Sequence, residues 1–206
     1  MSTIVKRPYH SPLRRAQADA TRARILDAAL LLFSESGYAA TTITAVAREA
    51  GVVPETIYAS FGTKKALIDG LIDRAAPPGT ASTLETRWVA EAGDPPAQLA
   101  VIAGFAADFW STNDALVRVL RQGSGDAEIG AEWTERQEAR RVLFGNALAG
   151  WPAGVRKAGL TRERAADLVW ALTSDELFHL LVIDRGWPVE AYRVWLTSAL
   201  RSALLR

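Results

Sequence analysis

Residues 41 to 61 read TTITAVAREAGVVPETIYASF, and they predict two short helices joined by a tight turn. Apolar residues recur at helical spacing in the first half, where Thr42 can cap the first turn. Gly51 provides the permissive backbone that ends a helix, and Pro54 suits the first position of the next helix. The expected order is therefore helix, turn and helix, ending at the aromatic Phe61.

Two helices this short do not fold alone, so Val52, Ile57 and Phe61 are expected to pack against a third helix. Thr21 to Ser36 can form it, with Gly37 as its stop. A fourth helix is predicted after the capping residue Thr63. The first and fourth helices are predicted from their apolar stripes. These stripes are Ile25, Ala28, Ala29, Leu32 and Phe33 in the first helix and Leu67, Ile68, Leu71 and Ile72 in the fourth.

The side chains that packing leaves free from Pro54 to Ser60 are short and capable of hydrogen bonding. Such groups suit base edges and phosphates in a major groove, so the leading interpretation is a DNA-binding helix-turn-helix. The alternative is an ordinary antiparallel helix pair inside an all-α domain. The free residues are Glu55, Thr56, Tyr58, Ala59 and Ser60.

Residues 22 to 72 resemble the TetR family of transcriptional repressors. The matching features are ILDAALLLF with Gly37 and an aromatic, Thr41-Thr42, Val46-Ala47, Ala50-Gly51-Val52, Ile57-Tyr58, Phe61, Lys64 and Ala66-Leu67. The family often has a small polar residue where Val53 stands, which puts the start of the second short helix in doubt. The resemblance implies that Tyr58 and Lys64 touch DNA phosphate and that a second domain binds a small molecule that loosens DNA binding.

Charge is concentrated at the front of the chain. The formal net charge is only +1, yet residues 1–24 carry +5 and the remainder −4. We interpret residues 1–18 as a basic arm that reaches DNA, the alternative being a solvated tail. Lys64 and Lys65 open the fourth helix, where an external anion or simple solubility would explain them. The predicted DNA contacts are Arg14, Arg15, Thr42, Pro54, Glu55, Thr56, Tyr58, Ser60 and Lys64.

Clusters of proline and glycine between residues 75 and 96 mark a domain boundary. The sequence then predicts an all-α chain with an arm at 1–18, a helix-turn-helix domain at 19–75 and a larger helical domain for ligand binding and dimerisation at 76–206. The later helices are expected at about 95–112, 114–122, 126–150, 161–185 and 188–205.

All seven tryptophans lie in the larger domain, which has enough aromatic bulk to line a cavity for an apolar ligand. Each aromatic taken alone is more often plain core. The residues assigned to a ligand site are Phe105, Phe109, Trp110, Trp133, Phe144, Trp170, Asp175, Phe178 and His179.

The last two helices carry more apolar surface than one core contact needs, which indicates a twofold homodimer built as a four-helix bundle. Such a dimer would present two DNA-binding helix-turn-helix units, here called reading heads, to a palindromic operator. The residues assigned to its interface are Leu168, Leu172, Leu180, Val182, Tyr192, Trp195, Leu196 and Leu200.

Enzyme and cofactor signals are weak. The absence of cysteine excludes disulfides, thiolate zinc sites and cysteine nucleophiles. Asp175, Glu176 and His179 share a helix but are too few for a metal site. No catalytic residue, metal or cofactor is therefore assigned, and without a signal peptide or membrane span a cytoplasmic location is expected. The rival hypotheses are a helical small-molecule carrier or enzyme, and an activator or regulator that answers to a protein partner.

Overall fold

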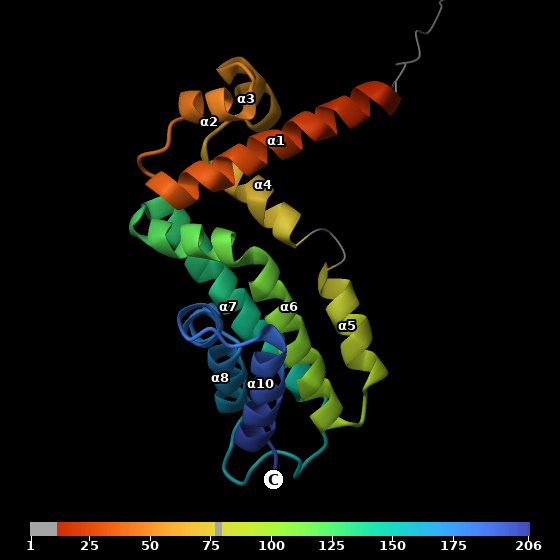
Figure 1. Ribbon diagram of the computed structural model, residues 1–206. Coiled ribbons are helices and arrows are strands. Elements are labelled where there is room, and N and C mark those ends of the chain that lie inside the picture. The colour runs from red at the N-terminus through yellow and green to blue at the C-terminus, as the bar shows by residue number, and fades with distance from the viewer. Residues whose placement is uncertain (1–11, 77–79) are drawn as a thin grey trace, which may run out of the picture. The chain divides into compact units, whose positions relative to one another are not determined.

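The structure is a computed structural model that describes residues 12–76 and 80–206 (Figure 1). Within these ranges the regular elements are all helices, joined by turns and loops, apart from an isolated strand-type bridge between Arg156 and Leu205. It divides into two compact units, with the boundary between Leu71 and Ile72. The predicted all-α fold is confirmed.

The first unit holds the predicted helix-turn-helix. Its helices are α1 (Pro12–Ser36), α2 (Ile43–Ala50), α3 (Pro54–Phe61) and the first part of α4 (Lys65–Ala75). Thr42 Oγ1 accepts a hydrogen bond from the Ala45 amide at 3.1 Å, and Thr63 Oγ1 caps α4 in the same way. Gly51 ends α2 in the left-handed region, with φ 64°. These local signals therefore act as the sequence indicates.

Helix α1 begins earlier than the sequence analysis predicts. It starts at Pro12 rather than near Thr21, so Arg14 and Arg15 lie on its exposed first turns and not in an irregular arm. Proline suits the first turn of a helix, and the alanines and arginines that follow favour helix. The rest of the predicted arm, including Lys6 and Arg7, lies outside the described residues, as do Pro77 to Gly79.

The second unit is a helical bundle. Helix α6 packs against α10, α5 and α7, and α8 packs against both α7 and α10. A π-helical turn follows α9 and leads into the loop before α10. The bounds are α5 (Thr80–Ala90), α6 (Pro95–Gln122), the 3-10 turn η1 (Gly123–Gly125), α7 (Ala127–Ala149), α8 (Arg162–Leu172), α9 (Asp175–Phe178), the π-helix η2 (His179–Asp184) and α10 (Val189–Leu204).

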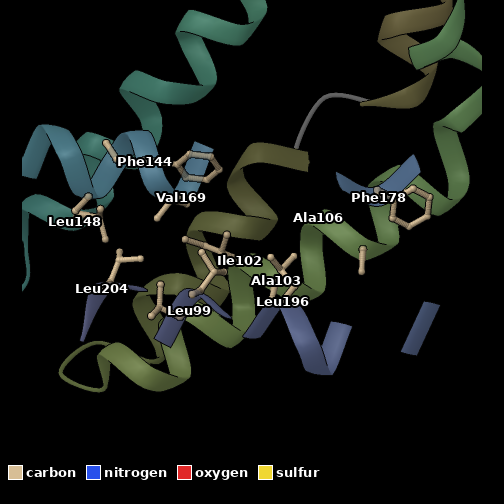
Figure 2. Packing of buried hydrophobic residues seen from close by; sticks show 14 of the residues in the cluster. Leu99, Ile102, Ala103, Ala106, Phe144, Leu148, Val169, Phe178, Leu196 and Leu204 are labelled. Carbon is tan, nitrogen blue, oxygen red and sulfur yellow. The ribbon is translucent and has the colours of Figure 1, made fainter. Parts of the chain in front are cut away.

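One hydrophobic core joins the helices of this bundle (Figure 2). Helix α6 contributes a row of small and branched residues, against which side chains of α7, α8, α9 and α10 pack. Burial of this kind is the main favourable term in folding. The labelled core residues are Leu99, Ile102, Ala103, Ala106, Phe144, Leu148, Val169, Phe178, Leu196 and Leu204.

Two predicted boundaries are wrong. The break expected at Thr112 and Asn113 is absent, because Thr112 Oγ1 and Asn113 Nδ2 donate to the carbonyls four residues before them, both at 2.9 Å, within one continuous α6. The helix expected at 161–185 is instead three elements. It breaks at Thr173 and Ser174, and Ser174 caps the new start by accepting from the Leu177 amide.

Candidate nucleic-acid interface and candidate ligand cavity

Helix α3 buries one residue and exposes most of the others. Ile57 is 1% exposed in the core of the first unit, whereas the neighbouring Tyr58 is 54% exposed. Glu55 and Ser60 are also exposed, and Thr56 is half-buried. The helix therefore presents a polar surface with one aromatic residue at its centre, as the sequence indicates. Pro54 is half-buried at the first turn, where the capping position Val53 makes no side-chain hydrogen bond.

Arg22 ties α1 to the end of α3. Its guanidinium donates to the Ser60 carbonyl at 2.9 Å and lies 4.0 Å above the ring of Phe61. Helix α4 approaches closely at Gly70, where a Cβ atom would lie 3.1 Å from both Phe61 and Leu26. These contacts fix the angle at which α3 is presented. From the sequence, Arg22 was expected only to add to the positive charge of residues 1–24, and its contact with α3 was not predicted.

Lys64 also has a positioning role. Its Nζ donates to the Ala39 carbonyl at 3.3 Å and lies 4.2 Å from the centre of the Tyr38 ring. Lys65 pairs with Asp69 at 2.9 Å. An external anion is therefore not needed to explain these two lysines at the start of α4. The predicted contact of Lys64 with phosphate stays a prediction.

Two apolar cavities lie in the second unit. One has a volume of about 180 Å³ and the other about 150 Å³, and both are lined by Phe109, Trp110 and Arg140. Of the predicted ligand residues, Trp133 lines the first, and Phe105 and Phe144 line the second. Trp170 lines neither cavity, and its indole nitrogen donates to Gln137 Oε1 at 3.1 Å.

Arg140 is the main site residue that the sequence analysis misses. Its two terminal nitrogens donate to the carbonyls of Thr173 and Trp170, both at 3.1 Å, and its Nε is buried without a partner. Burial lowers the pKa of Arg140 to about 10, against the opposing effect of Asp175, Glu176 and Tyr192. Arg140 is therefore still a cation at neutral pH. Nothing in the local sequence distinguishes it from the exposed arginines of α7.

Three of the predicted ligand residues, Asp175, Phe178 and His179, line a third, much smaller cavity. Its volume is about 10 Å³, roughly that of one water. His179 lies 3.5 Å from both Asp114 and Asp184. None of these three residues lines either apolar cavity, although Trp110 lines all three cavities, so the structure divides the predicted ligand residues between sites that share Trp110.

Asp175 is the most perturbed acid of this region. One carboxyl oxygen has no hydrogen-bond partner, and the other lies 3.5 Å from Arg121. Burial raises the pKa of Asp175 to about 6, Glu176 acts in the same direction, and Arg121 opposes both. A folded pKa above the usual value means that the protonated carboxyl favours folding. This contribution of the protonated carboxyl to the free energy of unfolding is complete at pH values below the pKa of Asp175 in the unfolded chain. It is lost as the pH rises through about 6.

Asp175→Asn is therefore expected to raise the free energy of unfolding by about 1–3 kcal/mol at about pH 7.5, and by less at about pH 5. Asparagine keeps the shape of the side chain and removes the charge that burial disfavours. Urea unfolding at both pH values measures the difference, with the exposed Asp73→Asn as control. A loss of stability at the higher pH would show that the pairing with Arg121 outweighs burial.

The predicted dimer residues fall into two groups. Tyr192, Leu196 and Leu200 are fully buried in the core of their own chain, so their assignment to an interface is corrected. Leu168, Leu172, Val182 and Trp195 are partly exposed, and Leu180 is 52% exposed. Helical spacing does not distinguish a face that packs inside the chain from one that packs on a copy. Ile183 of η2 and Val194 of α10, 47% and 63% exposed, are further exposed apolar residues that the sequence did not single out.

Among the described residues, no group of three or more histidine, aspartate or glutamate side chains could hold a metal ion. In residues 12–76 and 80–206, every helix is too short or too polar to cross a bilayer.

The first unit matches a known sequence family. Residues 25–71 match the family model of bacterial regulatory proteins of the tetR family. The HTH-type transcriptional regulator UidR of Escherichia coli (strain K12) is 38% identical over 58 residues. The uncharacterized HTH-type transcriptional regulator YvkB of Bacillus subtilis (strain 168) is 41% identical over 54 residues. Residues 25–71 are therefore similar to the DNA-binding region of tetR-family regulatory proteins.

These sequence matches are confined to the first part of the chain. They cover 28% and 26% of this chain, and 30% and 29% of UidR and YvkB. The segment that matches the family model lies within residues 22–72, where the sequence analysis finds its resemblance. The predicted resemblance to the TetR family is therefore confirmed.

Solved structures match most of the chain in fold. NalD, the secondary repressor of the MexAB-OprM multidrug efflux pump in Pseudomonas aeruginosa, has a TM-score of 0.76 at 21% identity over 92% of this chain and 98% of its own. SmeT in complex with triclosan has a TM-score of 0.70 at 18% identity, over 91% of this chain and 92% of its own. At identities of 18–21%, these matches show the fold alone. Because the matches cover 91–92% of this chain, the shared fold includes the second unit.

Proposed function

We propose that this chain is a DNA-binding transcriptional regulator, of the repressor type, whose reading head is α3. The observation that carries the proposal is the exposed polar face of α3, centred on Tyr58 and held from behind by the buried Ile57. An eight-residue helix fixed in this way suits a major groove. Arg14 and Arg15 add exposed positive charge on α1 for the phosphate backbone.

The regulator acts as a homodimer on a palindromic operator. This part of the proposal is supported by the exposed apolar surface of Leu180, Ile183 and Val194 on η2 and α10. A copy of the same chain would cover that surface around a twofold axis. Two reading heads would then meet two half-sites about one helical turn of DNA apart.

A small apolar or aromatic effector binds in the second unit and releases the DNA. The apolar walls of the two cavities support this, and Ile72 and Ala75 of α4 line one of them within the second unit. Because α4 continues into the first unit, a ligand that shifts its last turn can change how the two heads are spaced.

Selection of bound DNA from a random double-stranded pool by the full chain tests the function directly. The expected result is one enriched site with twofold symmetry, bound by a species that light scattering identifies as a dimer. A monomer that enriches no sequence at low ionic strength would overturn the proposal.

Reversal of one positive charge near the start of α1 is expected to weaken DNA binding. Arg14→Glu should lower the affinity for the selected site and reduce the salt slope by about one, because one phosphate contact is lost. The matched control is Arg162→Glu, which makes the same charge change at an exposed position in α8. Fluorescence anisotropy across a salt series measures both variants. Equal effects would attribute the loss to overall charge and not to a contact of Arg14.

A further inference from the structure

Both apolar cavities are lined by Arg140, a cation for which no salt bridge is found among the described residues. Of the residues that the structure describes, no carboxylate lies within 4.0 Å of a guanidinium nitrogen of Arg140. Its contacts are two neutral carbonyls and the faces of Trp110 and Trp170, whose ring centres lie 5.5 and 5.9 Å from its Cζ atom. A cation in an apolar wall is costly unless an anion or acceptor joins it.

The other polar side chains of the cavity lining already have partners. Asn113 donates to the Phe109 carbonyl, and the Gln137 oxygen accepts from Trp170. Arg136 is exposed and pairs with Glu132 at 2.8 Å. Arg140, in contrast, keeps a buried Nε–H without an acceptor. The lining therefore offers one unsatisfied, charged donor among apolar walls.

We propose that the effector is a small apolar monocarboxylate, whose carboxylate pairs with Arg140 and whose hydrocarbon or aryl part fills the apolar cavities. This inference rests on the proposed function, because it specifies the chemistry of the effector. Ion pairing to a buried guanidinium gives orientation and strength that an apolar contact lacks. Each cavity is smaller than the roughly 300–1,000 Å³ of drug-sized sites, which favours a ligand of modest size.

A matched pair of probes tests the proposal on the full chain. 4-Phenylbutyrate and 4-phenylbutan-1-ol share one skeleton and differ in the carboxylate. The acid is expected to bind about tenfold or more tightly than the alcohol at neutral pH, since a charged hydrogen bond is lost with the alcohol. Isothermal titration calorimetry measures both affinities.

Two variants assign the preference to Arg140. Arg140→Met should remove the preference for the acid and leave the alcohol affinity unchanged, which also reports that the cavity is still folded. Arg136→Met is the control, because Arg136 lines the same cavity but is exposed and paired. It should keep the preference. Arg140→Lys retains the charge and should keep part of the preference for the acid. This variant provides the test when Arg140→Met does not fold.

The proposal is overturned when acid and alcohol bind the unmodified chain alike, when neither binds at millimolar concentration, or when Arg140→Met keeps the preference for the acid. These outcomes are separable from failure of the proposed function. A chain that selects a symmetric DNA site but shows no preference for the acid is a regulator with a different effector. A chain that prefers the acid but selects no DNA keeps the ligand assignment and loses the regulatory one.

Discussion

Replacement of Ile57 by alanine is expected to destabilise the first unit by about 2–5 kcal/mol and to abolish specific DNA binding. Ile57 is the buried residue of α3, and an eight-residue helix does not persist without its tertiary anchor. The lost methyl and methylene groups leave a cavity in the small core that α1, α2 and α3 share. Without that anchor, the exposed face of α3 is no longer presented in one orientation.

Two optical signals can locate the effect of Ile57→Ala. All tryptophans follow residue 87, so their fluorescence reports on the second unit, whereas far-UV circular dichroism reports on every helix. In urea, far-UV circular dichroism should show helix loss in the variant at a lower denaturant concentration than in the unmodified chain. The midpoint of the tryptophan fluorescence transition should not change. Far-UV transitions that coincide in the variant and the unmodified chain would refute the role of Ile57 as anchor.

Tyr58→Ala is the matched control at the next position. Tyr58 is largely exposed, so its truncation should change the unfolding free energy by no more than about 0.5 kcal/mol. DNA binding should nevertheless fall, because the ring stands in the proposed contact face. The pair thus separates loss of the fold from loss of the contact within one helix.

Local chemistry explains why the first unit could be predicted well. The caps Thr42 and Thr63 and the left-handed Gly51 act within three or four residues, and they occupy the positions that the sequence indicates. The error at the start of α1 has a different cause. Arginines near Pro12 suggested an arm, but charge does not prevent a helix whose residues have high helical propensity.

The second unit shows what sequence periodicity leaves open. The spacing of Tyr192, Leu196 and Leu200 correctly marks an apolar face, but the choice between core and interface depends on which helices surround α10. The polar part of the cavity was missed for a similar reason. Arg140 reaches the carbonyls of Trp170 and Thr173, thirty or more residues away, and no local pattern encodes that contact.

Trp110→Ala is expected to lower the free energy of unfolding of the second unit by about 3–5 kcal/mol. Trp110 is buried, its indole N–H donates to the Thr173 carbonyl at 2.9 Å, and its ring meets that of Phe109 edge-on at 4.9 Å. Truncation removes all of these contacts and enlarges both apolar cavities. Urea unfolding followed by far-UV circular dichroism measures the loss without relying on tryptophan emission.

Two further variants divide the effect of Trp110 into its parts. Trp110→Phe keeps an aromatic ring and removes one donor to the Thr173 carbonyl, which still accepts from Arg140, so the lost hydrogen bond should cost about 0.5–1.5 kcal/mol in addition to the loss of volume. Trp133→Ala truncates a half-buried indole that lines one cavity, and it should cost less than Trp110→Ala. Equal costs for Trp110→Ala and Trp133→Ala would contradict the central place of Trp110.

The Thr173 carbonyl accepts hydrogen bonds from both Trp110 and Arg140. A large loss of stability on truncation of Trp110 therefore also means that the guanidinium of Arg140 is held by the same packed residues. The cation of the cavity is then oriented before any ligand arrives, which lowers the ordering cost of binding.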